Sequence, residues 1–314
     1  MTLDPHFKAM FDAQAAAAAG TTPPSVGSIP PAMVRAGYRA QRTSQNLNSA
    51  PASVIARNLE VGGADGPIPA RLYTPAEAAT PSGLVVYFHG GGFVIGDLET
   101  HDGHCRRLAH YSGQRVMAVD YRLAPEHPFP AGHDDALAAT RWAFDHAAEL
   151  GADPARIGVG GDSAGGNLAA SVALDLRGDP AHPLKLQLLL YPALWPQTET
   201  KSRQDRDGPV LSKAAMAFFE RSLAFGGHAQ ADRAAPARTA DLAGLPPAYV
   251  VTAGFDPLED EGRDYAAALA AAGVPAEDVN YPSLVHDFFI MGDVSPAVIE
   301  AAKAAGAATR AALG

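Results

Sequence analysis

Short apolar runs alternate with stretches of helical periodicity over most of this chain. From residue 54 onward, the apolar runs lie between Gly, Pro and polar clusters, which is typical of strands. The predicted strands are Val54 to Val61, Ile68 to Tyr73, Leu84 to Phe88, Val116 to Val119, Arg156 to Val159, Leu186 to Leu190, Ala248 to Thr252 and Ala276 to Tyr281. The run from Leu84 to Phe88 is apolar throughout, which indicates a strand covered on both faces. The pattern therefore predicts an α/β fold, with a mostly parallel central sheet flanked by helices.

Two segments depart from this alternation and have helical spacing instead. They contain predicted helices at His6 to Ala19, Pro31 to Arg42 and Leu211 to Phe225, with a break at Pro23-Pro24 and a polar loop from Gln197 to Gly208. The apolar sides of these helices need to be covered by the rest of the protein. We therefore predict a helical cap made of residues 1–50 and 197–227, resting on an α/β core made of residues 51–196 and 228–314.

The composition narrows the class of protein. A chain of 314 residues with 47% apolar residues is long enough for one large domain with an appendage. The net charge of −10, without a long basic cluster, argues against a nucleic-acid partner. No window approaches the roughly 18 uncharged apolar residues of a membrane span, so no membrane partner is expected. The single Cys105 cannot form an intrachain disulfide, and Asp4 and Asp12 interrupt the N-terminal apolar run, so we expect a cytoplasmic protein.

Candidate chemistry centres on the segment Gly161-Asp162-Ser163-Ala164-Gly165, which follows a predicted strand and precedes a helical stretch. A strand that turns abruptly into a helix crowds its own backbone, so glycine is needed on both sides of the central residue, whose side chain then projects from the sheet. The pattern predicts that Ser163 is a nucleophile. From this segment alone, a tight turn with an ordinary surface serine remains the alternative.

A serine hydroxyl needs a base to take its proton, and the base needs a carboxylate to orient it. His286 follows the last predicted strand through a short loop, and Asp256 follows the preceding strand. Sites in open α/β sheets form at the carboxyl edge of the strands, where both side chains are expected. The order serine, aspartate, histidine along the chain is that of one known class of triad. Asp260 is a rival for the acid, and Asp256 could also cap the helix that follows it.

The glycine-rich segment His89-Gly90-Gly91-Gly92 directly follows another predicted strand. Acyl transfer passes through a tetrahedral oxyanion, and backbone N–H groups in a glycine-rich turn can approach it without obstruction by side chains. We predict that the N–H groups of Gly91, Gly92 and Ala164 bind the oxyanion, with His89 and Gly90 supporting the loop. A phosphate-binding loop is the alternative, but its Lys-Ser/Thr or third-glycine pattern is missing.

Taken together, these motifs resemble those of the bacterial hormone-sensitive-lipase-like carboxylesterases, also called family IV esterases, of the α/β-hydrolase fold. The matching segments are His89-Gly90-Gly91-Gly92, Asp120-Tyr121-Arg122-Leu123-Ala124-Pro125-Glu126, Gly161-Asp162-Ser163-Ala164-Gly165-Gly166-Asn167 and Asp256-Pro257-Leu258 followed by Asp260-Glu261-Gly262. The resemblance runs from about residue 53 to the C-terminus. It implies that Ser163 is acylated, that His286 acts as base and then acid, that Asp256 orients His286, and that the cap shapes a pocket for short acyl chains.

One position departs from the family pattern. Where these esterases usually have His-Gly-Phe, this chain has His286-Asp287-Phe288. A carboxylate beside the base favours the imidazolium and so raises the pKa of the histidine. We therefore expect activity to fall on the acid side at a higher pH than in an Asp287→Gly variant, and overlapping pH–rate profiles would contradict this expectation.

Several residues near the motifs are assigned supporting or pocket roles. Glu126 and Asp162 are predicted to brace the loops around the site. Phe93 and Phe288 neighbour the catalytic positions and are expected to contact substrate, and the pocket prediction adds Leu258 and Phe219. The remaining aromatic residues of the predicted cap are interpreted as packing: Phe7, Phe11, Tyr38 and Phe218.

A metal site is considered at His101, Asp102, His104 and Cys105, which lie close together in sequence. The segment after Leu98 reads as a helix, which places His101 and Cys105 on one face and directs Asp102 elsewhere. Nothing else in the sequence supplies a partner ligand at a suitable spacing. We therefore expect neither a metal nor a cofactor.

The sequence as a whole favours a serine carboxylesterase that hydrolyses short- to medium-chain esters through an acyl-enzyme. Amide or lactone hydrolysis and acyl transfer use the same intermediates and stay open. A non-catalytic small-molecule receptor is a further alternative, because plant gibberellin receptors resemble the same family, but they lack the catalytic histidine that His286 supplies here. The resemblance also suggests a homodimer through the edge strand near Ala276 to Tyr281.

Overall fold

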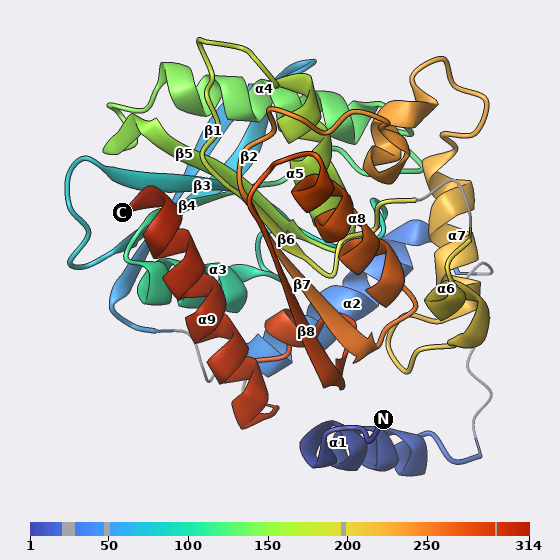
Figure 1. The fold of residues 1–314 in the computed structure, drawn as a ribbon. Coiled ribbons are helices and arrows are strands. Elements are labelled where there is room, and N and C mark those ends of the chain that lie inside the picture. Colours follow the sequence, from blue (N-terminus) through green and yellow to red (C-terminus); the bar gives the residue numbers. More distant parts are fainter. Residues whose placement is uncertain (21–28, 47–50, 196–198, 293) are drawn as a thin grey trace.

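The computed structural model describes residues 1–20, 29–46, 51–195, 199–292 and 294–314. At its centre lies an eight-stranded sheet with the order β1-β2-β4-β3-β5-β6-β7-β8 (Figure 1). The strands are β1 (Val54–Gly63), β2 (Gly66–Pro75), β3 (Ser82–Phe88), β4 (Arg115–Val119), β5 (Ala152–Asp162), β6 (Gln187–Leu190), β7 (Ala248–Phe255) and β8 (Ala276–Val285). β2 pairs with β1 and β4 in antiparallel fashion, and the other pairs are parallel. The mostly parallel sheet expected from the sequence is confirmed.

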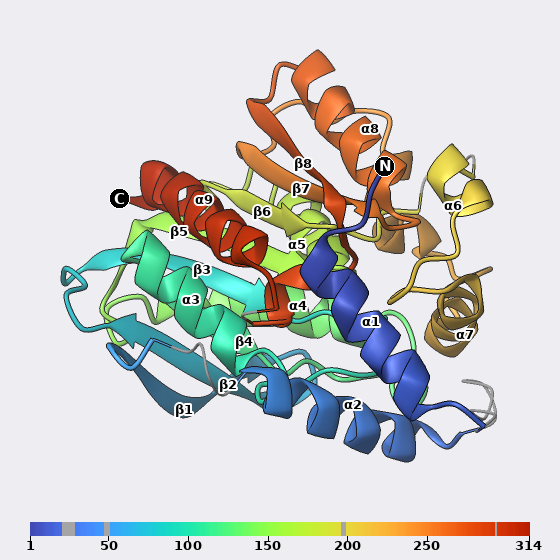
Figure 2. The same cartoon turned by 90° about the horizontal axis from the view of Figure 1, so that it is seen from below.

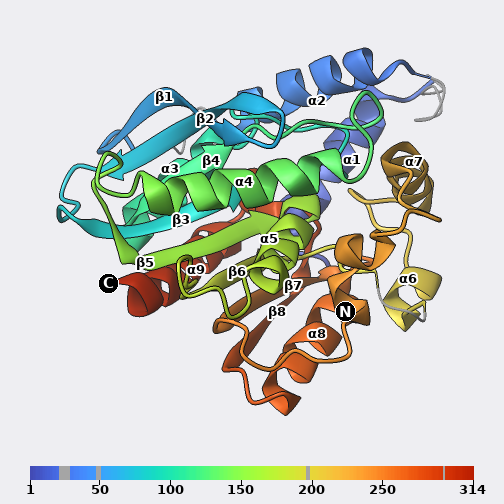
Figure 3. The same ribbon diagram turned by 90° about the horizontal axis from the view of Figure 1, so that it is seen from above.

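Helices cover both faces of this sheet. α3 (Asp102–Ser112) and α9 (Pro296–Leu313) lie over one face (Figure 2), while α4 (Ala131–Asp145), α5 (Ala164–Asp175) and α8 (Glu259–Ala271) lie over the other (Figure 3). Every residue of β3 is buried. Its Val86 belongs to the apolar cluster on one face, and its Val85 to the cluster on the other. Successive side chains of a strand point to opposite faces, which explains why the run from Leu84 to Phe88 in β3 is apolar throughout.

The remaining helices lie outside these two layers. They are α1 (Pro5–Ala17), α2 (Pro31–Asn46), α6 (Lys201–Asp205), α7 (Lys213–Leu223) and the 3-10 turns η2 (Ala231–Ala234), η3 (Pro236–Arg238) and η4 (Phe288–Ile290). The N-terminal helices α1 and α2 form a cap, and α2 extends beyond its predicted end at Arg42. None of the helices in the described ranges is long and apolar enough to cross a membrane.

The segment between the core and α7 differs from the predicted polar loop. It contains the short helix α6, which apolar periodicity could not reveal because its residues are polar. A side-chain cap starts this helix, since the Thr200 hydroxyl accepts from the N–H of Arg203, and Ser202 ties it down by donating to the Pro257 carbonyl at 2.8 Å. The predicted break at Pro23-Pro24 and the loop positions Gln197 and Thr198 lie outside the described residues.

Specific contacts attach the N-terminal helices to the core. Phe7 of α1 is fully buried, and the N–H of Asp4 donates to the Ser283 carbonyl at 3.0 Å. On α2, the guanidinium of Arg35 donates to the carbonyls of Val94 and Ala124 at 2.7 and 2.9 Å. The two helices therefore lie in defined positions above the carboxyl ends of the strands.

That carboxyl edge collects the segments that the sequence singles out. The glycine-rich loop follows β3, Ser163 follows β5, Asp256 follows β7 and His286 follows β8. Four stretches that are far apart along the chain thus meet at one end of the sheet, where open α/β sheets bind their ligands.

Candidate active site

Ser163 occupies a strained turn between β5 and α5. Its φ is +54°, in the left-handed region that few non-glycine residues adopt. The flanking backbone is too close for side chains, because a Cβ on Gly161 would lie 2.3 Å from the backbone of Gly165, and one on Gly165 would lie 1.9 Å from the carbonyl oxygen of Phe88. The two glycines are thus required by the close approach of strand, turn and helix, which holds the serine side chain at the end of the sheet.

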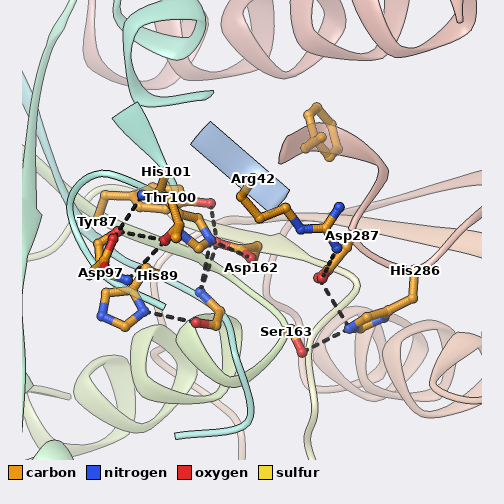
Figure 4. A network of polar contacts seen from close by, with 12 residues as sticks. Arg42, Tyr87, His89, Asp97, Thr100, His101, Asp162, Ser163, His286 and Asp287 are labelled. Atoms are coloured by element: carbon orange, nitrogen blue, oxygen red, sulfur yellow. Dashed lines mark hydrogen bonds and ion pairs between the residues drawn. The ribbon is translucent and has the colours of Figure 1, made fainter. Parts of the chain in front are cut away.

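Ser163, His286 and Asp256 form a hydrogen-bonded chain. His286 Nε2 lies 2.9 Å from Ser163 Oγ (Figure 4), and His286 Nδ1 lies 2.6 Å from Asp256 Oδ2. All three residues are buried. An ionised carboxylate on one side fixes Nδ1 as the protonated nitrogen, which leaves Nε2 free to accept the serine proton.

The structure distinguishes the two candidate carboxylates. Asp256 contacts His286, and its other oxygen accepts from the N–H of Leu258 at 2.8 Å in the turn before α8. Asp260 accepts instead from the N–H of Ser202 at 2.7 Å and thereby attaches α6 to α8. The expectation that Asp256 also caps α8 is not met, because that helix begins at Glu259 and Leu258 occupies its N-cap position.

The charge environment of His286 strongly favours the protonated ring. Burial alone lowers the pKa of this histidine, but the negative charges of Asp256 and Asp287 outweigh burial and raise the pKa to about 9. Asp287 Oδ1 lies 3.5 Å from Nε2, the same nitrogen that faces the serine. The direction of this shift agrees with the expectation drawn from His286-Asp287-Phe288.

The glycine-rich loop lies directly beside the serine. Gly91 and Gly92 have φ values of +113° and +59°, and a Cβ on Gly92 would lie 2.1 Å from the ring of Phe219. Both glycines line the same cavity as Ser163. Ala164 is the first residue of α5, so its N–H has no acceptor within the helix. The loop and the helix start thus place backbone donors of the predicted kind around the serine.

A buried polar network supports this loop from behind. Asp162 accepts from the Tyr87 hydroxyl at 2.7 Å and from the N–H of Gly90 at 3.1 Å, and its second oxygen lies 3.2 Å from His101 Nε2 (Figure 4). Burial raises the pKa of Asp162, but the adjacent His101 outweighs burial and holds it well below the usual range. The predicted bracing role of Asp162 thus has a physical basis in these contacts.

His101 was considered above only as a metal ligand, and the structure gives it this different partner. Its other ring nitrogen lies 2.9 Å from the Thr100 hydroxyl. Asp102 turns away and binds Arg71 and Arg106. Within the described ranges, no three His, Cys, Asp or Glu residues are grouped so that they could hold a metal ion.

Two further residues that were predicted to support the site, His89 and Glu126, differ in what they contact. His89 is buried, and its ring stacks on that of Tyr121 with 4.4 Å between the ring centres. The backbone carbonyl of His89 also accepts a hydrogen bond from the Tyr121 hydroxyl. Glu126 is half exposed and binds Arg35 of the cap at 2.6 Å. Glu126 therefore fixes α2 on the core through Arg35, rather than contacting the serine loop itself.

Two cavities meet at Ser163. The larger, of about 230 Å³, is bounded by the cap and by the histidine loop, and its lining includes Phe11, Tyr38, Arg42, Phe219, His286 and Asp287. The smaller, of about 30 Å³, also includes Ser163 and is lined mainly by apolar side chains, among them Phe93, Ala193, Trp195, Met216, Phe219 and Leu258. Phe93, Leu258 and Phe219 therefore line a cavity beside Ser163, and their contact with substrate stays a prediction.

The prediction for Phe288 is wrong. This side chain is fully buried, packs against Tyr191 and Phe289, and is absent from the lining of both cavities. The chain reverses at Asp287, whose φ is +64°, and enters η4, which directs Phe288 into the core. Adjacency in sequence to His286 was therefore a poor guide to the direction of the side chain.

Sequence reasoning missed Arg42 and Trp195. Arg42 belongs to α2, more than a hundred residues before the serine, and only the docking of that helix brings it to the cavity. Trp195 follows β6 and stacks on Phe93 with 5.6 Å between ring centres. The position of Trp195 shortly after a predicted strand at the carboxyl edge was a signal that could have identified it.

Known proteins are similar to this chain in both sequence and fold. A family model described as the alpha/beta hydrolase fold matches residues 85–290. Esterase LipI of Mycobacterium tuberculosis is 47% identical over 251 residues, which cover 78% of each chain. Carboxylesterase NlhH of the same organism is 44% identical over 239 residues, which cover 74% of this chain and 75% of the relative.

Solved structures of ester hydrolases are also similar to this chain in fold and sequence. The ester hydrolase EH1AB1 from the metagenome of Lake Arreo has a TM-score of 0.93 and 40% identity, and the match covers 99% of both chains. The thermostable carboxylesterase EstE1 from a metagenomic library has a TM-score of 0.85 and 40% identity, covering 91% of this chain and 99% of that one.

Proposed function

Because this chain belongs to the hormone-sensitive-lipase-like esterases of the α/β-hydrolase fold, and is thus a carboxylic ester hydrolase, we propose that it cleaves short-chain esters through an acyl-enzyme formed on Ser163. The observation that carries this proposal is the unbroken chain from Ser163 Oγ to His286 Nε2 at 2.9 Å and from His286 Nδ1 to Asp256 Oδ2 at 2.6 Å. Turnover of p-nitrophenyl esters by the intact enzyme and by Ser163→Ala tests it.

The proposed reaction has two halves. Nε2 of His286 takes the hydroxyl proton as Ser163 Oγ attacks the ester carbonyl, and Asp256 stabilises the imidazolium. The N–H groups of Gly91, Gly92 and Ala164 receive the oxyanion. His286 then gives its proton to the leaving alcohol, and a water molecule, activated in the same way, releases the acid from the serine. No cofactor takes part in this scheme.

The position of His286 supports an assignment of the two cavities. The leaving alcohol has to receive a proton from Nε2, so the alcohol occupies the larger cavity, which His286 lines. The acyl chain then extends into the smaller cavity, which is apolar and does not include His286. Its volume of about 30 Å³ is much smaller than the 230 Å³ of the larger cavity, so it suits short acyl chains.

Phe219 borders both cavities and limits the acyl side. In Phe219→Ala, we expect kcat/KM for p-nitrophenyl octanoate to rise about tenfold relative to that for the acetate, because removal of the ring opens space for additional methylene groups. The measurement is the ratio of kcat/KM across an acetate, butyrate and octanoate series.

The neighbouring Phe218 provides the matched control. Its ring packs on Val94, Ile95 and Ala124 under the cap and lines neither cavity. Phe218→Ala removes the same volume from the same helix, yet it should leave the chain-length ratio of the wild type. If both variants keep the wild-type ratio, Phe219 does not limit the acyl chain.

The proposal extends to the parts of the protein around the site. Residues 197–227 act as the second part of the cap, a role supported by Ala215 and Phe219 of α7, which line the larger cavity together with α1 and α2. A reducing, cytoplasmic location suits the single, buried Cys105.

A homodimer through the edge strand β8 is part of the same proposal. β8 is the last strand of the sheet, and among the described residues no further strand pairs with its outer edge. Light scattering should give twice the 32.5 kDa mass of one chain, and a monomer at all concentrations would contradict the dimer.

A further inference from the structure

A buried ion pair connects the cap to the histidine loop. Nη2 of Arg42, on α2, lies 3.2 Å from Oδ2 of Asp287 (Figure 4), and the two side chains are only 5% and 11% exposed. Arg42 also lies over the ring of Tyr38, with 5.1 Å between its guanidinium carbon and the ring centre. Both charged residues line the larger cavity beside Ser163. The pair therefore belongs to the wall of the active site.

The two oxygens of the Asp287 carboxylate face different partners. Oδ2 contacts Arg42, while Oδ1 lies 3.5 Å from Nε2 of His286. Nε2 is the nitrogen that must accept the proton of Ser163, 2.9 Å away. Asp287 thus stands between a fixed cation of the cap and the reacting nitrogen of the base.

This placement has a direct chemical consequence. A carboxylate beside Nε2 stabilises the imidazolium, which has no lone pair with which to accept the serine proton. Arg42 opposes that effect in two ways, because its positive charge offsets the carboxylate and its hydrogen bond holds one oxygen away from the imidazole. Removing Arg42 would leave the carboxylate free to turn fully to Nε2.

Other groups around His286 do not replace Arg42. Asp256, after β7, and Asp162, at the end of β5, add negative charge that favours the imidazolium. Tyr191, after β6, places its ring 4.9 Å from that of His286, and burial holds the pKa of Tyr191 well above its usual value, so it stays neutral. Burial likewise holds the pKa of Tyr38 on α2 above its usual range. Arg42 is the cation that faces this set of groups from α2.

We propose that Arg42 of the cap is a positioning residue that holds Asp287 off the catalytic histidine, so that docking of α2 sets the pH above which the enzyme is active. This inference rests on the proposed role of His286 as the general base. It gives the cap an electrostatic task in addition to shaping the cavity.

The test is the pH dependence of kcat/KM for p-nitrophenyl acetate, read at the isosbestic wavelength of the product. Only neutral His286 accepts the serine proton, so kcat/KM rises with pH through the histidine pKa. In Arg42→Gln, we expect the acid limb to move up by about one pH unit, a loss of about tenfold at a pH below the limb. Arg42→Lys keeps the charge and should retain the wild-type limb. Asp287→Asn removes the carboxylate and should move the limb to lower pH.

A double variant and a matched control make the test specific. In the Asp287→Asn background, Arg42→Gln should shift the limb by much less than in the wild type, because no carboxylate remains to be released. Arg39→Gln removes a cation from the same helix that pairs with Asp97 at 2.7 Å on the surface, and its limb should match that of the wild type. An Arg42→Gln limb that superimposes on the wild type, an equal shift in Arg39→Gln, or the full shift in the Asp287→Asn background would each overturn the proposal.

Further variants distinguish a failure of this inference from a failure of the fold or of the proposed function. If Arg42→Gln does not fold, Asp287→Asn still decides, since asparagine tolerates the left-handed conformation at this position and an unchanged limb would show that the carboxylate does not act on the base. If His286→Ala keeps wild-type turnover, the proposed function itself fails. An inactive His286→Ala together with unshifted limbs would refute only the role of Arg42.

Discussion

Replacing Ser163 by alanine is expected to lower kcat/KM for p-nitrophenyl acetate by on the order of 10⁵-fold or more, because no other group can form the acyl-enzyme. The hydroxyl is the first member of the chain that runs through His286 to Asp256. Steady-state rates at ester concentrations well below KM measure the loss. Intact-mass spectra of quenched reactions should show an acetyl adduct in the wild type and none in the variant.

Ser171 supplies a matched control for this substitution. It lies on α5, the helix that Ser163 precedes, is buried like Ser163, and its hydroxyl donates to the Arg233 carbonyl away from both cavities. Ser171→Ala should therefore keep activity close to that of the wild type. Wild-type turnover by a folded Ser163→Ala would show that the reaction does not pass through this serine.

Replacing Asp256 by asparagine should lower kcat by about 10⁴-fold, a loss that comes from the wrong tautomer rather than from lost packing. Asp256 Oδ2 accepts from Nδ1 of His286 at 2.6 Å, which keeps the proton on Nδ1. An asparagine amide can donate to Nδ1 and leave the proton on Nε2, where it blocks transfer from the serine. The loss also includes the missing charge that stabilises the imidazolium. Rates measured by pH-stat with ethyl acetate would record both contributions.

Asp260 is the control for this second substitution, because it is the acid that the sequence left as a rival. Its carboxylate accepts from the N–H of Ser202 and not from the histidine. Asp260→Asn should therefore cost less than about tenfold in kcat. If Asp260→Asn were the inactive variant and Asp256→Asn the active one, the assignment of the acid would have to be reversed.

Much of the fold was predictable because burial leaves its mark on local sequence. β3 is covered on both faces, and its run from Leu84 to Phe88 is accordingly apolar throughout. α6 escaped prediction for the opposite reason, since Ser202 holds it to Pro257 and Asp260 by polar contacts that no apolar pattern records.

The residues of the candidate site also differ in whether local sequence or the packing of distant segments determines their position. Ser163 could be found because the constraint on it is local: the glycines that its turn requires are its near neighbours in the chain. Phe288 was misplaced because the direction of its side chain depends on the reversal at Asp287, which one cannot read from the residue type. Asp256 was preferred to its rival Asp260 as the carboxylate partner of His286 because it follows a predicted strand, and the end of β7 places Asp256 against the ring, while Asp260 contacts Ser202.

The sequence by itself determined the strand pattern, the tight turn at Ser163 and the glycine-rich loop, because each depends on residues that lie together along the chain. The tertiary structure alone decided the direction of the Phe288 side chain, the two unequal cavities and the contact of Arg42 with Asp287. These features depend on where distant segments meet, and Arg42 is separated from Asp287 by 245 positions. Packing of α2 against the carboxyl edge of the sheet brings the two charges together, and no local pattern encodes that approach.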